Sequence, residues 1–147
     1  MKVLVDADAC PVKDIIIKVS KKYDIPVIML VDTCHVIDDN YSKTIVVDKF
    51  SDSVDFVLVN KIEKGDVVIT QDYGVAAMSL TKGAKVINQN GRVYNNENID
   101  KLLFERHVSQ KIRRGGGKIS GPSKRKREDD ANFEKAFGML LNSLNFS

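Results

Sequence analysis

Short apolar segments alternate with longer segments of helical pattern along most of this 147-residue chain. Strands are predicted at residues 2–5, 26–31, 43–47, 66–70 and 84–88. Helices are predicted over roughly 12–23, 51–62, 73–82, 97–113 and 130–144. Strands that alternate with helices are joined by right-handed crossovers. This order therefore predicts an α/β fold with a mostly parallel sheet that is covered by helices on both faces.

Local signals mark several boundaries of these elements. Pro11 suits the first position of the helix over 12–23, and Ser51 is expected to be the N-cap of the helix over 51–62. Gly83 is expected to end the helix over 73–82. Asn90-Gly91 predicts a tight turn before residues 92–94.

Composition excludes several classes of protein. Hydrophobic residues make up 43% and charged residues 29% of the chain, as in ordinary soluble domains. No apolar run is long enough to span a bilayer, and the N-terminus predicts a strand rather than a signal peptide. The two cysteines, Cys10 and Cys34, indicate neither a disulfide scaffold nor a zinc site. A cytoplasmic location is therefore expected.

Charge is distributed unevenly along the chain. Nine basic residues and no acidic residue lie between Arg106 and Arg127, whereas the net charge of the whole chain is only +3. The remainder is therefore acidic, which predicts two parts with separate roles. Residues 1–114 would form the α/β domain, and residues 115–147 a flexible basic segment followed by a helix that packs on the same domain.

The basic segment predicts either phosphate binding or only a solvated, mobile surface. Cations without acids attract polyanions through the release of counterions, and they contact the phosphate backbone rather than the bases. The residues expected to bind nucleic acid are Arg113, Arg114, Lys118, Lys124, Arg125, Lys126 and Arg127.

Acidic residues follow the ends of the first four predicted strands. They are Asp6 and Asp8, Asp32, Asp48, and Asp72, and the helix over 51–62 adds Asp52 and Asp55. The carboxyl ends of parallel strands form the edge of the sheet where ligands bind. Each acid alone is well explained as a helix cap or a solvated side chain, and Asp72 could cap the helix that follows it.

Capping does not explain two acids as close as Asp6 and Asp8. Carboxylates that gather at one edge raise each other's pKa, and a hard divalent cation such as Mg²⁺ removes this repulsion. The set Asp6, Asp8, Asp55 and Asp72 is therefore predicted to bind metal. Cys10, beside a helix N-terminus, is interpreted as a packed thiol, and neither histidine has the spacing of a metal ligand.

Four stretches of the chain resemble one known family. They are VDADACPVK, GDVVITQDYGVAA, KGAKVINQNGRVY and GPSKRKREDDANF, in this order. Together they are similar to the YaiI/YqxD family of uncharacterised bacterial proteins, a branch of the PIN-like nucleases. The resemblance covers nearly the whole chain. It implies a three-layer α/β/α sandwich with an acidic pocket at the carboxyl edge of the sheet.

The resemblance also implies a function. PIN-like nucleases hold Mg²⁺ or Mn²⁺ on carboxylates and hydrolyse phosphodiester bonds. Carried over by position, the metal ligands and catalytic acids would be Asp6, Asp8, Asp55 and Asp72. RNA is expected in preference to DNA. Flanking phosphates would be held by basic residues such as Lys13, Arg106, Arg113 or Arg114.

Two alternatives use the same residues differently. A haloacid-dehalogenase-like phosphatase also places Asp-x-Asp after a strand, which would make Asp6 the nucleophile and Asp8 the general acid. Asp66 and Asp72 loosely match the later acidic motif of that group. The second alternative is a non-catalytic nucleic-acid-binding module on a PIN-like fold, which would need the basic segment but no metal.

Overall fold

The computed structural model describes residues 1–8, 10–32, 39–48, 53–117 and 124–145. The strands are β1 (Val3–Asp6), β2 (Val27–Val31), β3 (Lys43–Val46), β4 (Val67–Ile69), β5 (Lys85–Ile87) and β6 (Val93–Tyr94). The helices are α1 (Lys13–Lys22), α2 (Val54–Lys61), α3 (Tyr73–Thr81), α4 (Asn96–Arg114) and α5 (Arg127–Asn145). Every predicted strand and helix is present, with ends that differ by a few residues.

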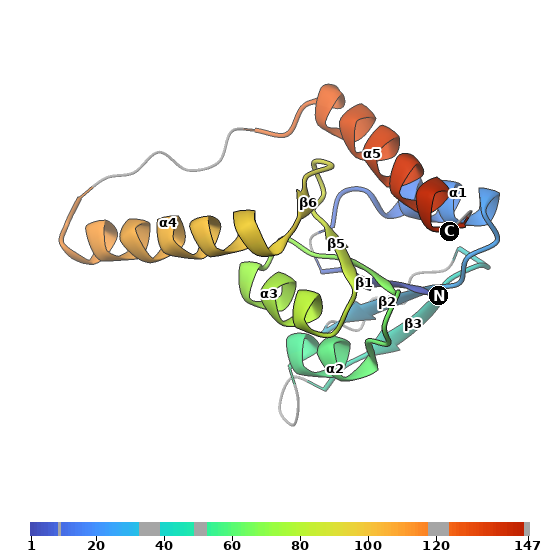
Figure 1. Cartoon of the computed structure of the whole chain (residues 1–147), viewed down its shortest axis with the longest axis horizontal. Helices are drawn as coiled ribbons and strands as arrows, with labels where there is room; N and C mark the ends of the chain where they lie inside the picture. The colour runs from blue at the N-terminus through green and yellow to red at the C-terminus, as the bar shows by residue number, and fades with distance from the viewer. Residues whose placement is uncertain (9, 33–38, 49–52, 118–123, 146–147) are drawn as a thin grey trace.

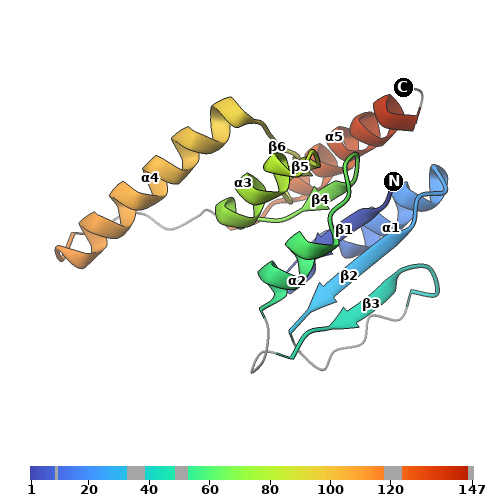
Figure 2. The same cartoon turned by 60° about the horizontal axis from the view of Figure 1, so that its bottom comes forward.

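The strands form one sheet in the order β3-β2-β1-β4-β5-β6 (Figure 2). Strands β1 to β5 run parallel, and β6 pairs with β5 in the antiparallel direction. From β1 the chain first builds the sheet outward through β2 and β3, and it then crosses back to place β4 on the other side of β1. The carboxyl ends of β1 and β4 are therefore the point where the winding of the sheet reverses, and ligands bind at such points.

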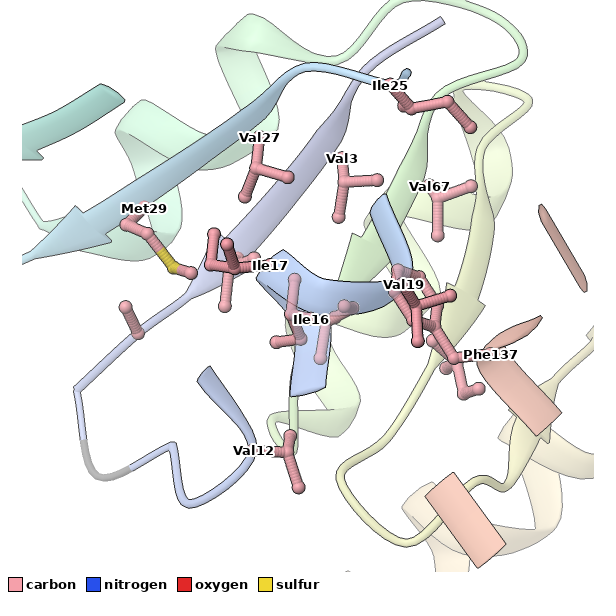
Figure 3. Close-up of a cluster of buried hydrophobic side chains, with 14 of the residues drawn as sticks. Val3, Val12, Ile16, Ile17, Val19, Ile25, Val27, Met29, Val67 and Phe137 are labelled. Carbon is pink, nitrogen blue, oxygen red and sulfur yellow. The ribbon is translucent and has the colours of Figure 1, made fainter. Parts of the chain in front are cut away.

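One face of the sheet is covered by α1 and α5. Side chains alternate between the two faces of a strand, so Val3 and Val5 of β1 point to this side. They pack with Ile16 of α1 and Phe137 of α5, both fully buried (Figure 3).

The other face is covered by α2, α3 and the beginning of α4. Leu4 of β1 points to this side and packs in one cluster with Leu58 of α2, Val75 of α3 and Ile99 of α4. Helices on both faces of a mostly parallel sheet confirm the predicted three-layer α/β/α fold.

Helix α5 is part of the core rather than an appendage. Phe133, Phe137 and Leu141 recur every four residues and are fully buried, and α5 packs on α1. The rings of Phe133 and Phe137 stack with their centroids 5.3 Å apart. The division of the chain at residue 114 into a domain and a basic segment stays a prediction.

The start of α5 is tied to the turn between β5 and β6. Arg125 donates to the side chain of Asn90 over 2.6 Å and to the carbonyl of Gln89 over 2.9 Å, and it pairs with Asp130. The turn contains the predicted Gly91, which has a φ of +89°. A β-carbon there would lie 2.7 Å from the carbonyl oxygen of Asn132 in α5, so only glycine allows this close approach.

Two predicted helix starts were wrong. Helix α1 begins at Lys13 with Val12 as its N-cap, so Pro11 precedes the cap instead of occupying the first helical position. The N-cap of α2 is Ser53, whose side chain accepts a hydrogen bond from the Phe56 N–H over 3.1 Å. Ser51 lies outside the described residues. The end of α3 is as predicted, with Gly83 at a φ of +83° just after the last turn.

Helix α4 extends well beyond the sheet. Its first half packs against α3 and buries Ile99 and Leu102. Its second half projects away from the rest of the molecule (Figures 1 and 2). Among the helices of the described ranges, none is both long and apolar enough to cross a membrane.

Candidate metal-binding and phosphodiester site

Asp6 and Asp72 lie at the carboxyl ends of the two central strands. Asp6 is the last residue of β1, and Asp72 follows β4 as the N-cap of α3. The Asp72 Oδ1 atom accepts hydrogen bonds from the N–H groups of Gly74, over 2.8 Å, and Val75, over 3.1 Å. The capping role weighed for Asp72 from the sequence is therefore real, and it fixes where this carboxylate points.

Thr70 connects these two acids. Its buried hydroxyl donates to Asp6 Oδ2 over 3.1 Å and accepts from the N–H of Asp72, also over 3.1 Å. The Thr70 side chain thus links the end of β1 to the residue that caps α3. In the sequence, Thr70 is recognisable only as the last residue of the strand predicted over 66–70. Its place two residues before a predicted site acid was the signal that could have singled it out.

Asp8 and Asp55 are close enough to this centre that their charges act on Asp6. Asp8 Oδ2 accepts the N–H of Asp32 over 2.8 Å, which joins the chain after β1 to the end of β2. Asp55 lies in the first turn of α2, one residue after the helix starts. Asp52 lies outside the described residues, so of the two helical acids only Asp55 has a described position.

The four carboxylates interact electrostatically. The pKa of Asp6 is raised from 3.8 to about 6, and burial of the carboxylate is the largest cause. The negative charges of Asp55, Asp72 and Asp8 contribute to this rise, whereas the hydrogen bond from Thr70 opposes it by lowering the pKa. The pKa of Asp55 is also raised, first by burial and then by the charge of Asp72. The fold thus gathers four acids whose charges oppose one another.

These acids do not form a complete protein cage for a cation. Within the described ranges, no three His, Cys, Asp or Glu side chains form a group that could hold a metal ion by themselves. Mg²⁺, however, usually keeps several waters and takes only one or two carboxylates. The hydrogen bonds described here engage Oδ2 of Asp6, Oδ2 of Asp8 and Oδ1 of Asp72. Among the described residues, the second oxygen of each of these carboxylates takes no part in these hydrogen bonds, and such an oxygen is the kind of donor that a hydrated Mg²⁺ or Mn²⁺ would use.

A cavity of about 350 Å³ opens at this edge of the sheet. Its lining consists of Asp6, Gln71, Asp72, Tyr73 and Arg106. The Tyr73 ring meets the buried Tyr94 ring edge to face, with centroids 6.0 Å apart and planes at 74°. The Gln71 side chain donates a hydrogen bond to that of Gln89, which follows β5. The cavity therefore combines two carboxylates, a guanidinium and an aromatic ring.

The structure separates the cations that the sequence grouped together. Arg106 lines the cavity beside Asp6 and Asp72, whereas Arg113 and Arg114 lie exposed further along α4. Lys124, Lys126 and Arg127 are exposed, and Lys118 lies outside the described residues. Arg125 is occupied by its bonds to the β5–β6 turn and to Asp130. As nucleic-acid contacts, all seven residues of the predicted set stay predictions.

Cys10 is a partly buried thiol that packs against the core cluster beneath α1. Burial raises its pKa, while the N–H of Val12 and the charge of Lys13 lower it. A raised pKa suits a packed thiol rather than a nucleophile. His107 is exposed on α4, and Cys34 and His35 lie outside the described residues.

Asp66 lies at the opposite end of β4 from the site. It precedes β4, at the amino edge of the sheet, and its buried carboxylate accepts the Lys2 ammonium over 2.7 Å and the Glu63 N–H over 2.8 Å. It cannot act together with Asp72, which follows the same strand at its other end. The position of Asp66 therefore does not support the phosphatase alternative.

Comparison with known proteins identifies relatives along nearly the whole chain. Residues 4–143 match a family model described as "Uncharacterized BCR, YaiI/YqxD family". A UPF0178 protein of Ruminiclostridium cellulolyticum is 63% identical over 96% of this chain and 92% of its own length. The UPF0178 protein of Alkaliphilus oremlandii is 56% identical over 92% and 87% of the two chains, and that of Exiguobacterium sibiricum is 49% identical over 96% of both. No solved structure matches the chain. The resemblance to the YaiI/YqxD family is thereby confirmed, and the chain belongs to that family.

Proposed function

We propose that this protein is a Mg²⁺- or Mn²⁺-dependent nuclease on a PIN-like fold, which hydrolyses phosphodiester bonds and favours RNA over DNA. The observation that carries the proposal is the cavity at the carboxyl edge, because Asp6, Asp72 and Arg106 line it together. A phosphodiester needs a cation near the attacked phosphorus and a positive group for the flanking phosphate. The cavity offers a donor set for the first and Arg106 for the second.

The carboxylates have the chemistry that a hard cation requires. Asp6 and Asp72 would bind the metal directly. Asp8 and Asp55 would supply further negative charge close to the cation. A bound cation would lower the pKa of a coordinated water and stabilise negative charge on the phosphate in the transition state. The raised pKa values of Asp6 and Asp55 support this assignment, because a divalent cation relieves the repulsion that raises them.

The remaining side chains hold the reacting groups in place. Thr70 orients Asp6 and, through the N–H of Asp72, fixes the start of α3. The guanidinium of Arg106 would bind the phosphate next to the scissile bond, since it can donate two parallel hydrogen bonds to phosphate oxygens. The exposed cations Arg113 and Arg114 would extend contact along the backbone without reading sequence.

Cleavage of end-labelled single-stranded RNA and DNA with Mg²⁺ or Mn²⁺ tests the activity. Asp6→Asn and Asp72→Asn are expected to abolish cleavage, and chelation of the metal by EDTA should do the same. Asparagine caps helices as well as aspartate does, so Asp72→Asn keeps α3 intact. The matched control is Asp24→Asn, an exposed acid just before β2, at the amino edge. Unchanged metal-dependent cleavage in both site variants would refute the proposal.

A crystal soaked in Mn²⁺ gives a test that needs no substrate. An anomalous peak beside Asp6 and Asp72 is expected, and its loss in Asp6→Asn would assign it to this site. A map without a peak in the wild-type crystal would contradict the metal assignment.

Nucleic-acid binding without catalysis is the second candidate. The observation that favours it is the exposure of Arg113, Arg114, Lys124, Lys126 and Arg127. Salt-sensitive RNA binding that survives EDTA and Asp6→Asn, with no cleavage by the wild-type protein, would select this function over the nuclease.

A further inference from the structure

The second half of α4 buries no residue against the described part of the molecule, although Arg106 at its beginning lines the cavity. Ile99 and Leu102 anchor the first half on the core, but no residue from 104 to 117 is buried. This half of the helix stands clear of the sheet in both views (Figures 1 and 2). A helix of this length in water is stabilised mainly by packing an apolar face, so the bare half requires an explanation.

An apolar stripe runs along this projecting half. Phe104, Val108 and Ile112 are 67%, 37% and 44% exposed, and they follow each other at intervals of four residues. Residues four apart lie on one face of a helix. Val108 lies nine residues, or two and a half turns, after Ile99. The stripe therefore faces directly away from the side that α4 buries against the body, and at its far end Gly117 lies against Ile112.

Charge is segregated along the same helix. Three acids, Glu97, Asp100 and Glu105, lie in its first half, where Lys101 is the only cation. The second half carries Arg106, Lys111, Arg113 and Arg114, and no acid. Two parallel copies of α4 would place like charges together, whereas two antiparallel copies would place each basic half beside an acidic half.

We propose that α4 is a self-association surface on which a second copy of this chain binds with its own α4 antiparallel. The two-fold axis would pass near Val108, so that Phe104 packs against Ile112 of the partner subunit. Asp100 and Arg114 flank the stripe on one side of the helix, and the antiparallel arrangement brings Asp100 next to Arg114 of the partner subunit. This inference does not depend on the proposed nuclease activity.

A second copy fits this surface better than a nucleic acid does. Phe104, Val108 and Ile112 offer nothing to a phosphate, and Arg106, the cation that lines the cavity, lies on the opposite side of the helix. Three apolar side chains from each copy bury less than the roughly 1,200 Å² of a standard interface, so the dimer should be weak and concentration-dependent.

Sedimentation velocity over a wide range of protein concentrations tests the proposal. The wild-type chain is expected to shift from monomer to dimer, and Val108→Lys should weaken association at least about tenfold, because it places two ammonium groups at the two-fold axis. The matched control is Met139→Lys, a 65% exposed side chain on α5, which should associate like the wild type. Circular dichroism verifies that each variant remains folded.

Charge reversal tests the antiparallel arrangement. Asp100→Arg and Arg114→Asp should each weaken the dimer, and the double variant should restore it because the pair is complementary again. In a background with Cys10 and Cys34 replaced by serine, Val108→Cys should form an intermolecular disulfide on oxidation. Gln110→Cys, on the side of the helix that faces the body, should not.

A chain that stays monomeric at every concentration would overturn the proposal, and so would a double reversal that fails to restore association. Equal weakening by Val108→Lys and Met139→Lys would show that the association does not use α4. Loss of RNA binding in Val108→Lys, with no dimer in the wild type, would assign the stripe to nucleic acid instead.

Discussion

Replacing Asp6 with asparagine should stabilise the fold at neutral pH when no divalent cation is present. Burial and three neighbouring carboxylates make the charge of Asp6 unfavourable in the folded chain. Asparagine removes this charge but keeps an oxygen that can accept the hydrogen bond from Thr70. The gain in stability should therefore come from electrostatics and not from a change in packing.

The size of the effect follows from the raised pKa of Asp6. Below about pH 3.8 the carboxyl is protonated in the folded and the unfolded chain alike, so its contribution vanishes. Between 3.8 and about 6 the unfolded chain loses the proton while the folded chain retains it, and the free energy of unfolding falls as the pH rises. The full difference between these two pKa values corresponds to about 3 kcal/mol. Because the side chain is partly exposed, solvent screening reduces this to about 1–2 kcal/mol.

Urea unfolding in EDTA, followed by circular dichroism, measures this difference. At about pH 7.5, Asp6→Asn should be more stable than the wild type by about 1–2 kcal/mol, and at about pH 4.5 by only about a third of that, roughly 0.4–0.7 kcal/mol. Asp24→Asn, an exposed acid outside the site, should track the wild type at both pH values.

Adding Mg²⁺ should reverse the order of stability. A ligand that binds only the folded state stabilises it, and only the wild type keeps the full set of carboxylates. The reasoning is refuted if Asp6→Asn is less stable than the wild type in EDTA at neutral pH, or if the gain is the same at both pH values.

Three further substitutions test one hydrogen-bonded contact at the site and two packing contacts elsewhere in the fold. Thr70→Val should lower the free energy of unfolding by about 2–3 kcal/mol, because the Asp6 carboxylate and the Asp72 N–H both lose their hydrogen bond to the hydroxyl. The same substitution should raise the pKa of Asp6 in an NMR titration. Thr70→Ser should keep the stability and the pKa of the wild type. Phe137→Ala should lower the free energy of unfolding by about 3–5 kcal/mol in a urea titration, and no loss would contradict the central place of α5 in the core. Gly91→Ala should lower the free energy of unfolding by at least about 1 kcal/mol, because alanine disfavours the positive φ and its β-carbon would meet the Asn132 carbonyl. An unchanged melting temperature would show that α5 can move away from the turn without loss of stability.

Much of the fold follows from local pattern. Each strand and helix could be predicted because its apolar residues recur with the period of a strand or of a helix, and this period is visible over a short stretch of sequence. The local pattern did not fix the start of α2, since Ser51 and Ser53 are both good caps; the cap in the structure is Ser53. The capping role of Asp72 could also be anticipated, because a cap is a local interaction.

The arrangement of the site depends on contacts that the local pattern does not contain. Asp6 and Asp72 lie together because β4 pairs with β1, and this pairing is a property of the whole sheet. In the sequence, nothing distinguishes Arg125 from the other three cations of its basic run. Its partners Gln89 and Asn90 lie far earlier in the chain, so only the folded structure shows its role. The choice of Arg106 over its neighbours likewise required the path of α4 past the carboxyl edge.

The position of α5 has a consequence for how the chain is synthesised. The residues of β1 and α1 emerge from the ribosome first, but the helix that seals their shared face contains Phe133, Phe137 and Leu141 and is translated after every strand. Contacts between such distant segments form slowly, because a long loop must close before they gain any stability. During translation, therefore, Val3, Val5 and the apolar side of α1 stay partly uncovered. This face is therefore where a nascent chain of this protein is expected to engage chaperones, and we expect it to be the last part of the molecule to acquire its native packing.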